Sequence, residues 1–356
     1  MAVYWFLIGF PVIYFLTRYA PGKREKTNRK TILFFFIGMI ILLWLRSPYI
    51  GADTPNYLRM YVRARNIGFS GILTAYEGEY GYFALNMLVA ALYDNQQFFF
   101  LCIGVVSLFP VMLFYAKYSE NALITIGLFL LFLFSMYFSG LRQVCAMAFV
   151  FPAYYATKEK RIFKFLLCVI AATMFHTSAY ALALLYPVYY AKIKKSWWGF
   201  LVPVIAVVYW QRVRVFNFLL YFLPDQYQER YAELTESAAV TVLILMILLV
   251  VFTYIISDEK KLDQETSGFR NLLVLSMVLQ IFASINSVAM RLNYYYLLFV
   301  PITISKYVHL SVRRYAQIAK LAEVILSVFF IVYFIMQMYM GADILRIFPY
   351  KFYFQN

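Results

Sequence analysis

Long apolar runs that carry almost no charge are the feature that most restricts how this chain can fold. Residues 238–256 and 272–282 contain no charged side chain at all. A helix needs roughly 20 predominantly apolar residues to cross a bilayer, where it satisfies its own backbone hydrogen bonds. The chain is only 14% charged, whereas soluble domains carry about 25% charged residues. The pattern predicts an all-α polytopic membrane protein that forms one transmembrane domain over residues 1–356.

Lysine and arginine set the expected topology, because cytoplasmic loops of membrane proteins are enriched in both. Residues 18–30 hold six basic side chains and one acidic one, so this loop is expected inside. The alternation that follows gives about 12 spans, with both termini and the loops near 48–95 and 211–237 on the outer side. The expected spans are residues 1–20, 31–47, 97–116, 122–139, 141–156, 162–175, 178–190, 197–210, 238–256, 271–287, 291–308 and 321–340.

Several of these segments are short for a span. Residues 80–93 are expected to form an interfacial or re-entrant helix, because counting them as a span would invert every later loop. The two segments that flank His176 are also short. They predict either a locally thinned bilayer or a helical hairpin whose tip, His176 to Ser178, lies below the outer surface.

The sequence lacks the motifs that are typical of several classes of function. The net charge of +15 follows from the basic inner loops and does not indicate a nucleic-acid partner. No P-loop, Gly-rich dinucleotide turn, Gly-x-Ser-x-Gly or His-Glu-x-x-His motif occurs. The three cysteines lack metal-ligand spacing, and two histidines without an acidic cluster make a poor metal site. We therefore expect no cofactor and no bound metal.

The basic residues differ in kind between the two expected sides. Of the 32, lysine is the majority among the 21 inside, whereas ten of the 11 outside are arginine. The rule that sets topology treats both residues alike, but arginine grips phosphate oxygens at two points. The asymmetry therefore indicates a phosphate ligand, or else ion pairs with outer acids. The acids considered are Asp53, Glu77, Glu79, Asp225, Glu229, Glu233 and Glu236.

Three residues are candidates for catalysis. Arg142, followed by Gln143, opens an expected span, and a guanidinium at a helix N-terminus favours an anion; the alternative is an arginine that snorkels to the headgroups. His176 lies at the expected hairpin tip beside Ser178, and its ordinary pKa near ~6.5 suits proton transfer; the alternative is a packing residue. Arg291 lies in a short polar turn between two expected spans.

Other residues are candidates for substrate binding, including Gln143 next to Arg142 and Ser178 near His176. Tyr294 and Tyr295 follow Arg291 and could bind sugars or belong to the aromatic belt. Asp53 and Tyr57 follow the second expected span, and Asp53 either caps a turn before a short helix or orients a catalytic group. The remaining candidates, Arg212 and Arg214, lie in the outer loop 211–237, which could be a lid or a connector.

Four short motifs together resemble the EpsG-like, Wzy-type family of exopolysaccharide and O-antigen polymerases. They are Gly-Ala-Asp-x-x-x-Tyr at 51–57, Gly-Leu-Arg-Gln at 140–143, Phe-His-Thr-Ser-Ala at 175–179 and Arg-x-x-Tyr-Tyr at 291–295. Their order and spacing cover residues 51–305. The chain departs from better-described members in the short loop at 211–237.

The resemblance implies a fold, a reaction and a location. The fold is the all-helical, GT-C-like type of lipid-sugar glycosyltransferases and ligases, which need no metal. The reaction is transfer of a glycan from an undecaprenyl-diphosphate carrier to a lipid-linked repeat unit at the outer face of the bacterial cytoplasmic membrane. A flippase and a chain-length regulator are the further partners implied, beside the membrane lipids.

Two other functions remain open. A flippase for lipid-linked oligosaccharide would also use buried arginines, but through the depth of a cavity, whereas the arginines here are expected on one face. A membrane acyltransferase would need a histidine on the acyl-donor side, whereas His176 is expected outside.

Overall fold

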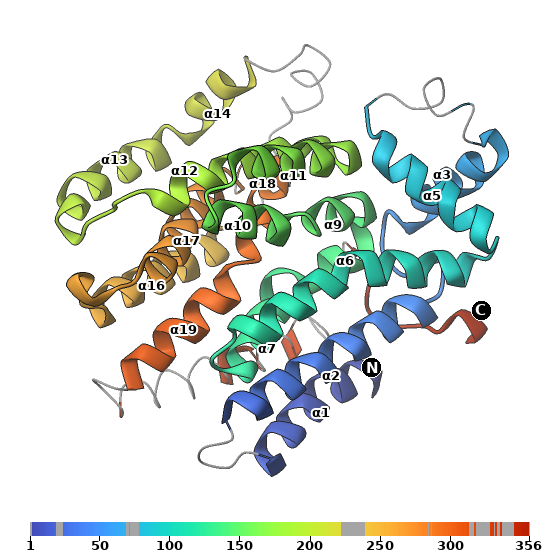
Figure 1. Cartoon of the computed structure of the whole chain (residues 1–356), viewed down its shortest axis with the longest axis horizontal. Helices are drawn as coiled ribbons and strands as arrows, with labels where there is room; N and C mark the ends of the chain where they lie inside the picture. Colours follow the sequence, from blue (N-terminus) through green and yellow to red (C-terminus); the bar gives the residue numbers. More distant parts are fainter. Residues whose placement is uncertain are drawn as a thin grey trace.

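The computed structural model describes residues 2–18, 24–68, 71, 78–221, 239–283, 285, 287–312, 317, 328–330, 332, 335–336 and 345–355. These residues form helices joined by short turns (Figure 1). Within these ranges, extended backbone pairs only in the isolated bridge between Arg46 and Phe352. The all-helical class expected from the sequence is confirmed.

The helices follow one another with few residues between them. The first half contains α1 (Ala2–Arg18), α2 (Arg24–Leu45), α3 (Thr54–Ile67), α5 (Tyr80–Leu92), α6 (Gln96–Tyr118), α7 (Ala122–Phe132), α8 (Phe134–Ser139), α9 (Leu141–Met147) and α10 (Val150–Lys158). The second half contains α11 (Ile162–Phe175), η2 (Thr177–Leu184), α12 (Leu185–Tyr190), η3 (Lys195–Trp197), α13 (Trp198–Trp210), α14 (Arg212–Leu220), α16 (Ala239–Ile256), η4 (Glu259–Lys261), α17 (Gln264–Ala283), α18 (Ser287–Leu297) and α19 (Val300–Val312). A last short turn, η5 (Tyr353–Gln355), ends the described chain.

Among the described residues, three helices are long and apolar enough to cross a bilayer: α2, α6 and α17. The pair made by η3–α13 and α14 is bent by 79° and adds a fourth if the two parts are counted as one span. These helices support a multi-pass membrane protein, while the number of 12 spans stays a prediction. The expected span at 321–340 lies largely outside the described residues.

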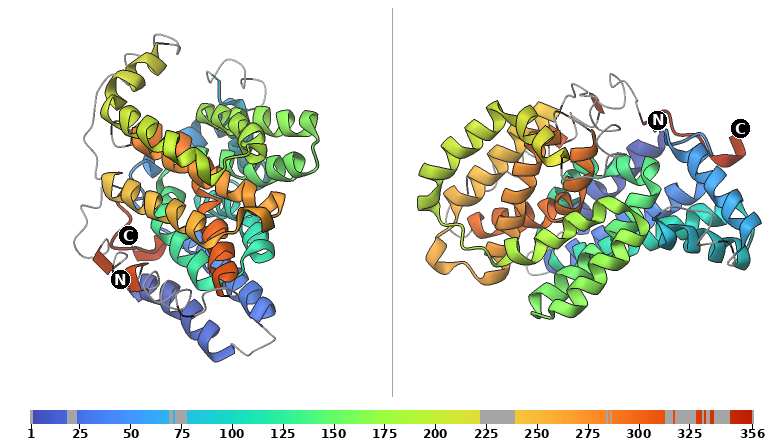
Figure 2. Two further views of the ribbon diagram at one scale, coloured as in Figure 1. Left: turned by 90° about the vertical axis from the view of Figure 1, so that its left-hand side faces the viewer. Right: turned by 90° about the horizontal axis from the view of Figure 1, so that it is seen from above.

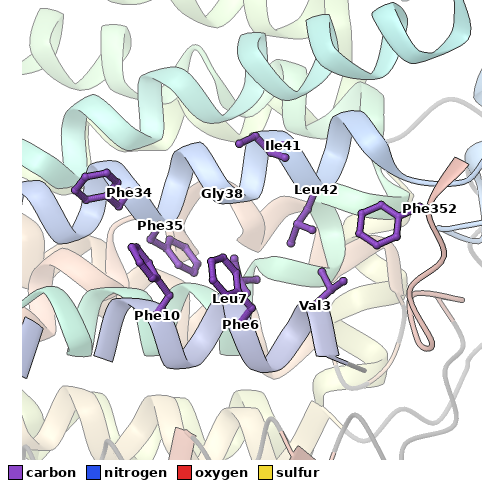
Figure 3. Close-up of a pocket in the computed structure, with 10 residues that line it drawn as sticks. All are labelled: Val3, Phe6, Leu7, Phe10, Phe34, Phe35, Gly38, Ile41, Leu42 and Phe352. Carbon is purple, nitrogen blue, oxygen red and sulfur yellow. The ribbon is translucent and has the colours of Figure 1, made fainter. Parts of the chain in front are cut away.

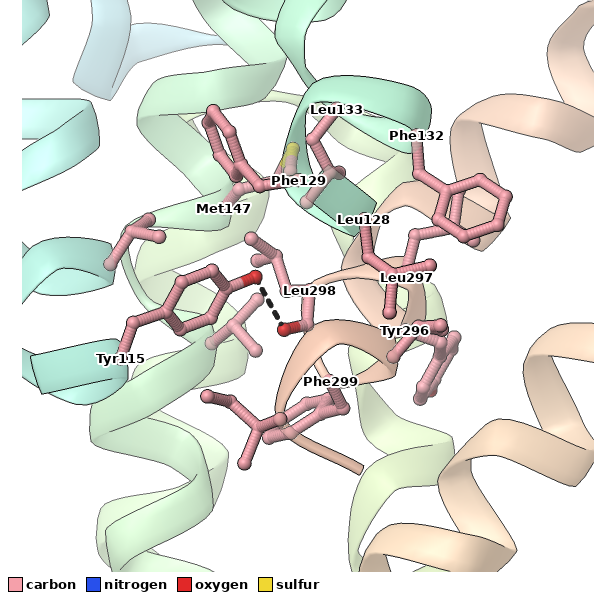
Figure 4. Packing of buried hydrophobic residues seen from close by; sticks show 14 of the residues in the cluster. Tyr115, Leu128, Phe129, Phe132, Leu133, Met147, Tyr296, Leu297, Leu298 and Phe299 are labelled. Atoms are coloured by element: carbon pink, nitrogen blue, oxygen red, sulfur yellow. Dashed lines mark hydrogen bonds between the residues drawn. The ribbon is translucent and has the colours of Figure 1, made fainter. Parts of the chain in front are cut away.

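Three of the expected spans are each broken into two α-helices. Residues 122–139 form α7 and α8, residues 141–156 fall in α9 and α10, and residues 291–308 fall in α18 and α19. A break leaves backbone carbonyls without an intrahelical partner, which is costly in an apolar interior. Side chains supply the missing donors: the hydroxyl of Tyr115 donates to the carbonyl of Leu298 at 2.7 Å (Figure 4).

One aromatic and aliphatic core joins the two halves of the chain. Helix α2 packs along α6, α17 packs against α16 and α18, and α19 packs against α7 (Figures 1 and 2). Rings of Phe114, Tyr154, Phe269 and Phe299 contact one another at its centre, with Phe114 and Phe299 centroids 5.9 Å apart. This core holds α9 and α18, which carry the catalytic candidates Arg142 and Arg291.

An apolar groove of about 400 Å³ lies between α1 and α2 (Figure 3). Its walls include Leu7, Phe10, Phe34 and Leu42, and Phe352 from the C-terminal segment lies at one end of it. A surface of this kind is compatible with the hydrocarbon interior of a membrane.

Candidate functional site

One buried carboxylate, that of Glu79, binds both a candidate arginine and the candidate histidine. The guanidinium of Arg142 donates through Nη1 to Glu79 Oε2. Nδ1 of His176 lies 2.7 Å from Glu79 Oε1, and the amide of Thr177 donates to the same oxygen at 3.2 Å. The side chain of Glu79 is 7% exposed and that of Arg142 is 28% exposed. The arginine therefore reaches the surface, while the acid lies behind it.

Three helix ends bring these groups together. Arg142 is the second residue of α9, which begins at Leu141 directly after Gly140, as the sequence predicts. His176 separates α11 from η2, and these elements pack against each other as the expected hairpin. Glu79 directly precedes α5.

Helix α5 approaches α11 closely because residue 81 is glycine. A Cβ at Gly81 would lie 3.0 Å from both Met174 Cβ and Phe175 Cε2. This spacing is tighter than ordinary van der Waals contact, so a larger residue would push the start of α5 away from the end of α11. The contact therefore sets the distance between Glu79 and His176.

The contacts of Glu79 fix the proton on His176. Burial raises the pKa of Glu79, but the hydrogen bond from His176 and the charge of Arg142 outweigh it and hold the pKa below its ordinary value. An ionised carboxylate can only accept hydrogen bonds, so Nδ1 of His176 carries the hydrogen. In the neutral ring, Nε2 is then the nitrogen that can accept a proton.

We expect this ion cluster to make stability depend on pH. Because the pKa of Glu79 is lower in the folded than in the unfolded protein, its contribution is complete above the ordinary value of 4.5 and is lost as pH falls through the folded value. The Glu79→Gln variant should lose this part of the pH dependence. Thermal unfolding of the purified protein from about pH 3 to pH 7 measures it.

A matched control for this experiment is Asp94→Asn. Asp94 also pairs with an arginine, Arg65, at 2.9 Å, but its side chain is 46% exposed. Exposed ion pairs contribute little, so this variant should keep the wild-type dependence. An unchanged slope in Glu79→Gln would contradict the prediction.

Arg291 lies beside this cluster, but not in the turn that the sequence indicated. It is the fifth residue of α18, which begins at Ser287, so the expected turn placement was wrong. The helix extends backwards because Ser287 to Arg291 contains no proline or glycine. Gln143 links the two arginine segments by donating through Nε2 to the carbonyl of Arg291 at 2.5 Å.

The guanidinium of Arg291 is available for a ligand. Across the described ranges it forms no ion pair and no side-chain hydrogen bond. Its charge acts on the hydroxyls of Tyr57, Tyr294 and Tyr295. Since the charge of Arg142 also acts on Tyr57, both arginines lie within electrostatic reach of one tyrosine.

Tyr57 forms one wall of the site and Asp53 lies at its edge. The ring of Tyr57 is buried, with the guanidinium of Arg142 5.8 Å from its centroid. Burial raises the pKa of Tyr57, against the charges of Arg142 and Arg291. Pro55 lies at the start of α3 as expected, but the exposed carboxylate of Asp53 makes no capping hydrogen bond. The orienting role considered for Asp53 therefore falls to Glu79.

Two other candidates meet each other. The hydroxyls of Ser178 and Tyr295 lie 3.0 Å apart, which joins η2 to α18. Tyr295 is fully buried, whereas Tyr294 is partly exposed. Of the two tyrosines, Tyr294 is therefore the one that a ligand can contact.

Arg212 and Arg214 are not brought to this cluster. The guanidinium of Arg212 bonds the carbonyl of Tyr209 at 3.1 Å and lies over its ring, and Arg214 is exposed. Helix α14 packs through Phe216 against Ala289, two residues before Arg291. The rest of the loop, residues 222–237, lies outside the described residues, so a lid role stays a prediction.

From the sequence, Glu79 is expected only as one of the acids that pair with outer arginines in the alternative to a phosphate ligand. That alternative is what the structure shows for Arg142, but the same carboxylate also binds His176. An available signal was that Glu79 directly precedes an apolar helix in a chain with only 17 acidic residues. In the described ranges, no group of three His, Cys, Asp or Glu side chains could hold a metal ion.

The chain matches a known protein family. Residues 29–352 match the family model described as the EpsG family, which covers nearly the whole chain. No curated protein and no solved structure matches this chain.

Proposed function

Because this chain belongs to the EpsG family of Wzy-like polysaccharide polymerases, we propose that it lengthens a glycan on a lipid carrier. The donor is a growing glycan on undecaprenyl diphosphate, and the acceptor is a single lipid-linked repeat unit. Both substrates are anchored in the same membrane and meet by lateral diffusion. The site lies at the outer face of the cytoplasmic membrane, the side on which the expected topology places most of the arginines.

The observation that carries this proposal is the shared carboxylate of Glu79. It holds a base candidate, His176, and a partly exposed cation, Arg142, on its two oxygens. A carboxylate that orients a histidine is a recurring arrangement for proton transfer. Here the neighbouring arginine adds a binding group for the anionic end of a donor.

The acceptor hydroxyl loses its proton to Nε2 of His176 as its oxygen attacks C1 of the donor sugar. Glu79 keeps the hydrogen on Nδ1 and stabilises the imidazolium that forms, as carboxylates do in related dyads. The proton is later released to water. This role requires the ring orientation that the 2.7 Å contact with Glu79 provides.

The bond between C1 and the diphosphate oxygen breaks with the electron pair going to the diphosphate. The transition state has oxocarbenium-ion character, as in other glycosyl transfer. Negative charge therefore grows on the leaving group, where fixed guanidinium groups stabilise it. Arg142 and Arg291 supply these groups, with Tyr294 and Tyr57 beside them for the sugar.

Reconstitution tests the function directly. Purified full-length protein in liposomes, supplied with a lipid-linked repeat unit, should form a ladder of longer lipid-linked glycans. Electrophoresis of the extracted lipids measures the ladder. Movement of the unit across the bilayer without lengthening would instead support a flippase, and acylation of the sugar would support an acyltransferase.

A further inference from the structure

The junction between α8 and α9 sets where Arg142 lies. Helix α8 ends at Ser139 and α9 begins at Leu141. In a continuous helix the carbonyl of Phe138 would accept the amide of Arg142, four residues later. The break at Gly140 removes that arrangement, so the carbonyl needs another donor.

Arg46 supplies this donor from a distant part of the chain. Its Nη1 donates to the carbonyl of Phe138 at 2.6 Å, and the hydroxyl of Thr54 adds a longer bond of 3.4 Å. Arg46 directly follows α2 and is 1% exposed. A cation at the C-terminal end of a helix also interacts favourably with the helix dipole.

The guanidinium of Arg46 lies between aromatic rings and forms no ion pair with an acid that the structure describes. It lies 4.3 Å from the ring centroid of Phe100 and 5.8 Å from that of Phe138. Contact with ring faces offsets part of the cost of burying a cation. An apolar residue would avoid that cost altogether. The buried charge therefore indicates that the hydrogen bond from Arg46 to the carbonyl of Phe138 is important for the local structure.

The contacts of Arg46 reach the first turn of α9 through Phe100. Phe100 belongs to the same buried cluster as Leu141, Tyr57 and Tyr82. On the other side, Gly51 has a φ of +92°, and a Cβ there would lie 2.2 Å from the carbonyl oxygen of Phe138. Glycine at this position therefore lets the loop that carries Asp53 approach the same carbonyl.

We propose that Arg46 is a positioning residue that fixes the α8–α9 junction and thereby holds Arg142 against Glu79. Only the expected effect of Arg46 on the rate of glycan lengthening rests on the proposed function. The geometric claim, that loss of Arg46 moves Arg142 away from Glu79, stands independently of any reaction.

The test replaces Arg46 with methionine, an apolar side chain of similar length. The fold is expected to survive, because Thr54 still bonds the carbonyl of Phe138 and a buried charge is removed. Since the charge of Arg142 lowers the pKa of Glu79, Glu79 should take up its proton at higher pH in Arg46→Met. Infrared titration of the protonated carboxyl band, assigned by its loss in Glu79→Gln, measures this shift without substrate. The rate of lengthening should fall by about tenfold or more, as for a lost charged hydrogen bond.

Two variants complete the design. Arg46→Lys keeps a charged donor and should restore most of both effects, whereas Arg65→Met removes an exposed arginine and should change neither. A folded Arg46→Met protein with wild-type titration of Glu79 overturns the inference. If that variant does not fold, Arg46→Gln decides: it replaces the guanidinium that bonds the carbonyl of Phe138 with a shorter, neutral amide and should shift the same band, and a wild-type titration in this variant also overturns the inference. The two claims can fail separately. If the band shifts in Arg46→Met but the wild-type protein forms no polymer, the positioning role stands and the proposed function is overturned.

Discussion

His176→Ala is expected to lower the rate of glycan lengthening by about 10²–10⁴-fold, the usual contribution of a positioned general base. The imidazole is buried against Glu79, and in the proposed reaction it is the only group that takes the acceptor proton. Alanine leaves Glu79 paired with Arg142, so binding of the donor diphosphate should change little. The loss should therefore appear in kcat more than in KM, which initial rates in liposomes at varied donor concentration measure.

The chain offers its own control for this variant. His309, the other of its two histidines, lies in α19 and is no part of the cluster. The His309→Ala protein should lengthen glycans at the wild-type rate. A His176→Ala protein that lengthens glycans normally would leave His176 with a packing role and remove the proposed base.

Arg142→Ala and Arg291→Ala should both abolish most lengthening, with an expected loss of about 10²–10³-fold each, as for removal of one donor to a developing anion. They should differ in stability. Arg142→Ala leaves the buried Glu79 with fewer partners, which costs about 1–3 kcal/mol in the free energy of unfolding. Arg291 has no ion pair within the described ranges, so its removal should leave stability nearly unchanged.

Activity and thermal unfolding of both variants, measured on the same preparations, test this difference. Arg65→Ala serves as the control, because it removes an arginine whose ion pair with Asp94 is exposed. It should retain activity and stability. Polymer of normal length from Arg142→Ala or Arg291→Ala would contradict the proposed diphosphate clamp.

Local features of the site were predictable because local signals produce them. The break before Arg142 is explained by Gly140. The turn at His176 lies between two apolar segments of helical length. The resemblance to the EpsG family, based on four short motifs, is confirmed by the family match. In contrast, Arg291 was expected in a turn, because the short polar stretch before it resembles a loop, although α18 already begins at Ser287.

The sequence by itself determined the all-helical membrane class, since hydrophobicity and helix length act within about 20 residues. Only the tertiary structure decided that Glu79 joins Arg142 and His176, because these contacts connect residues 63 and 97 positions apart. The same holds for Arg46, which bonds a carbonyl 92 positions away. No periodicity or motif encodes such pairings, which depend on how α5, α9 and α11 pack against one another and on how the end of α2 meets α8.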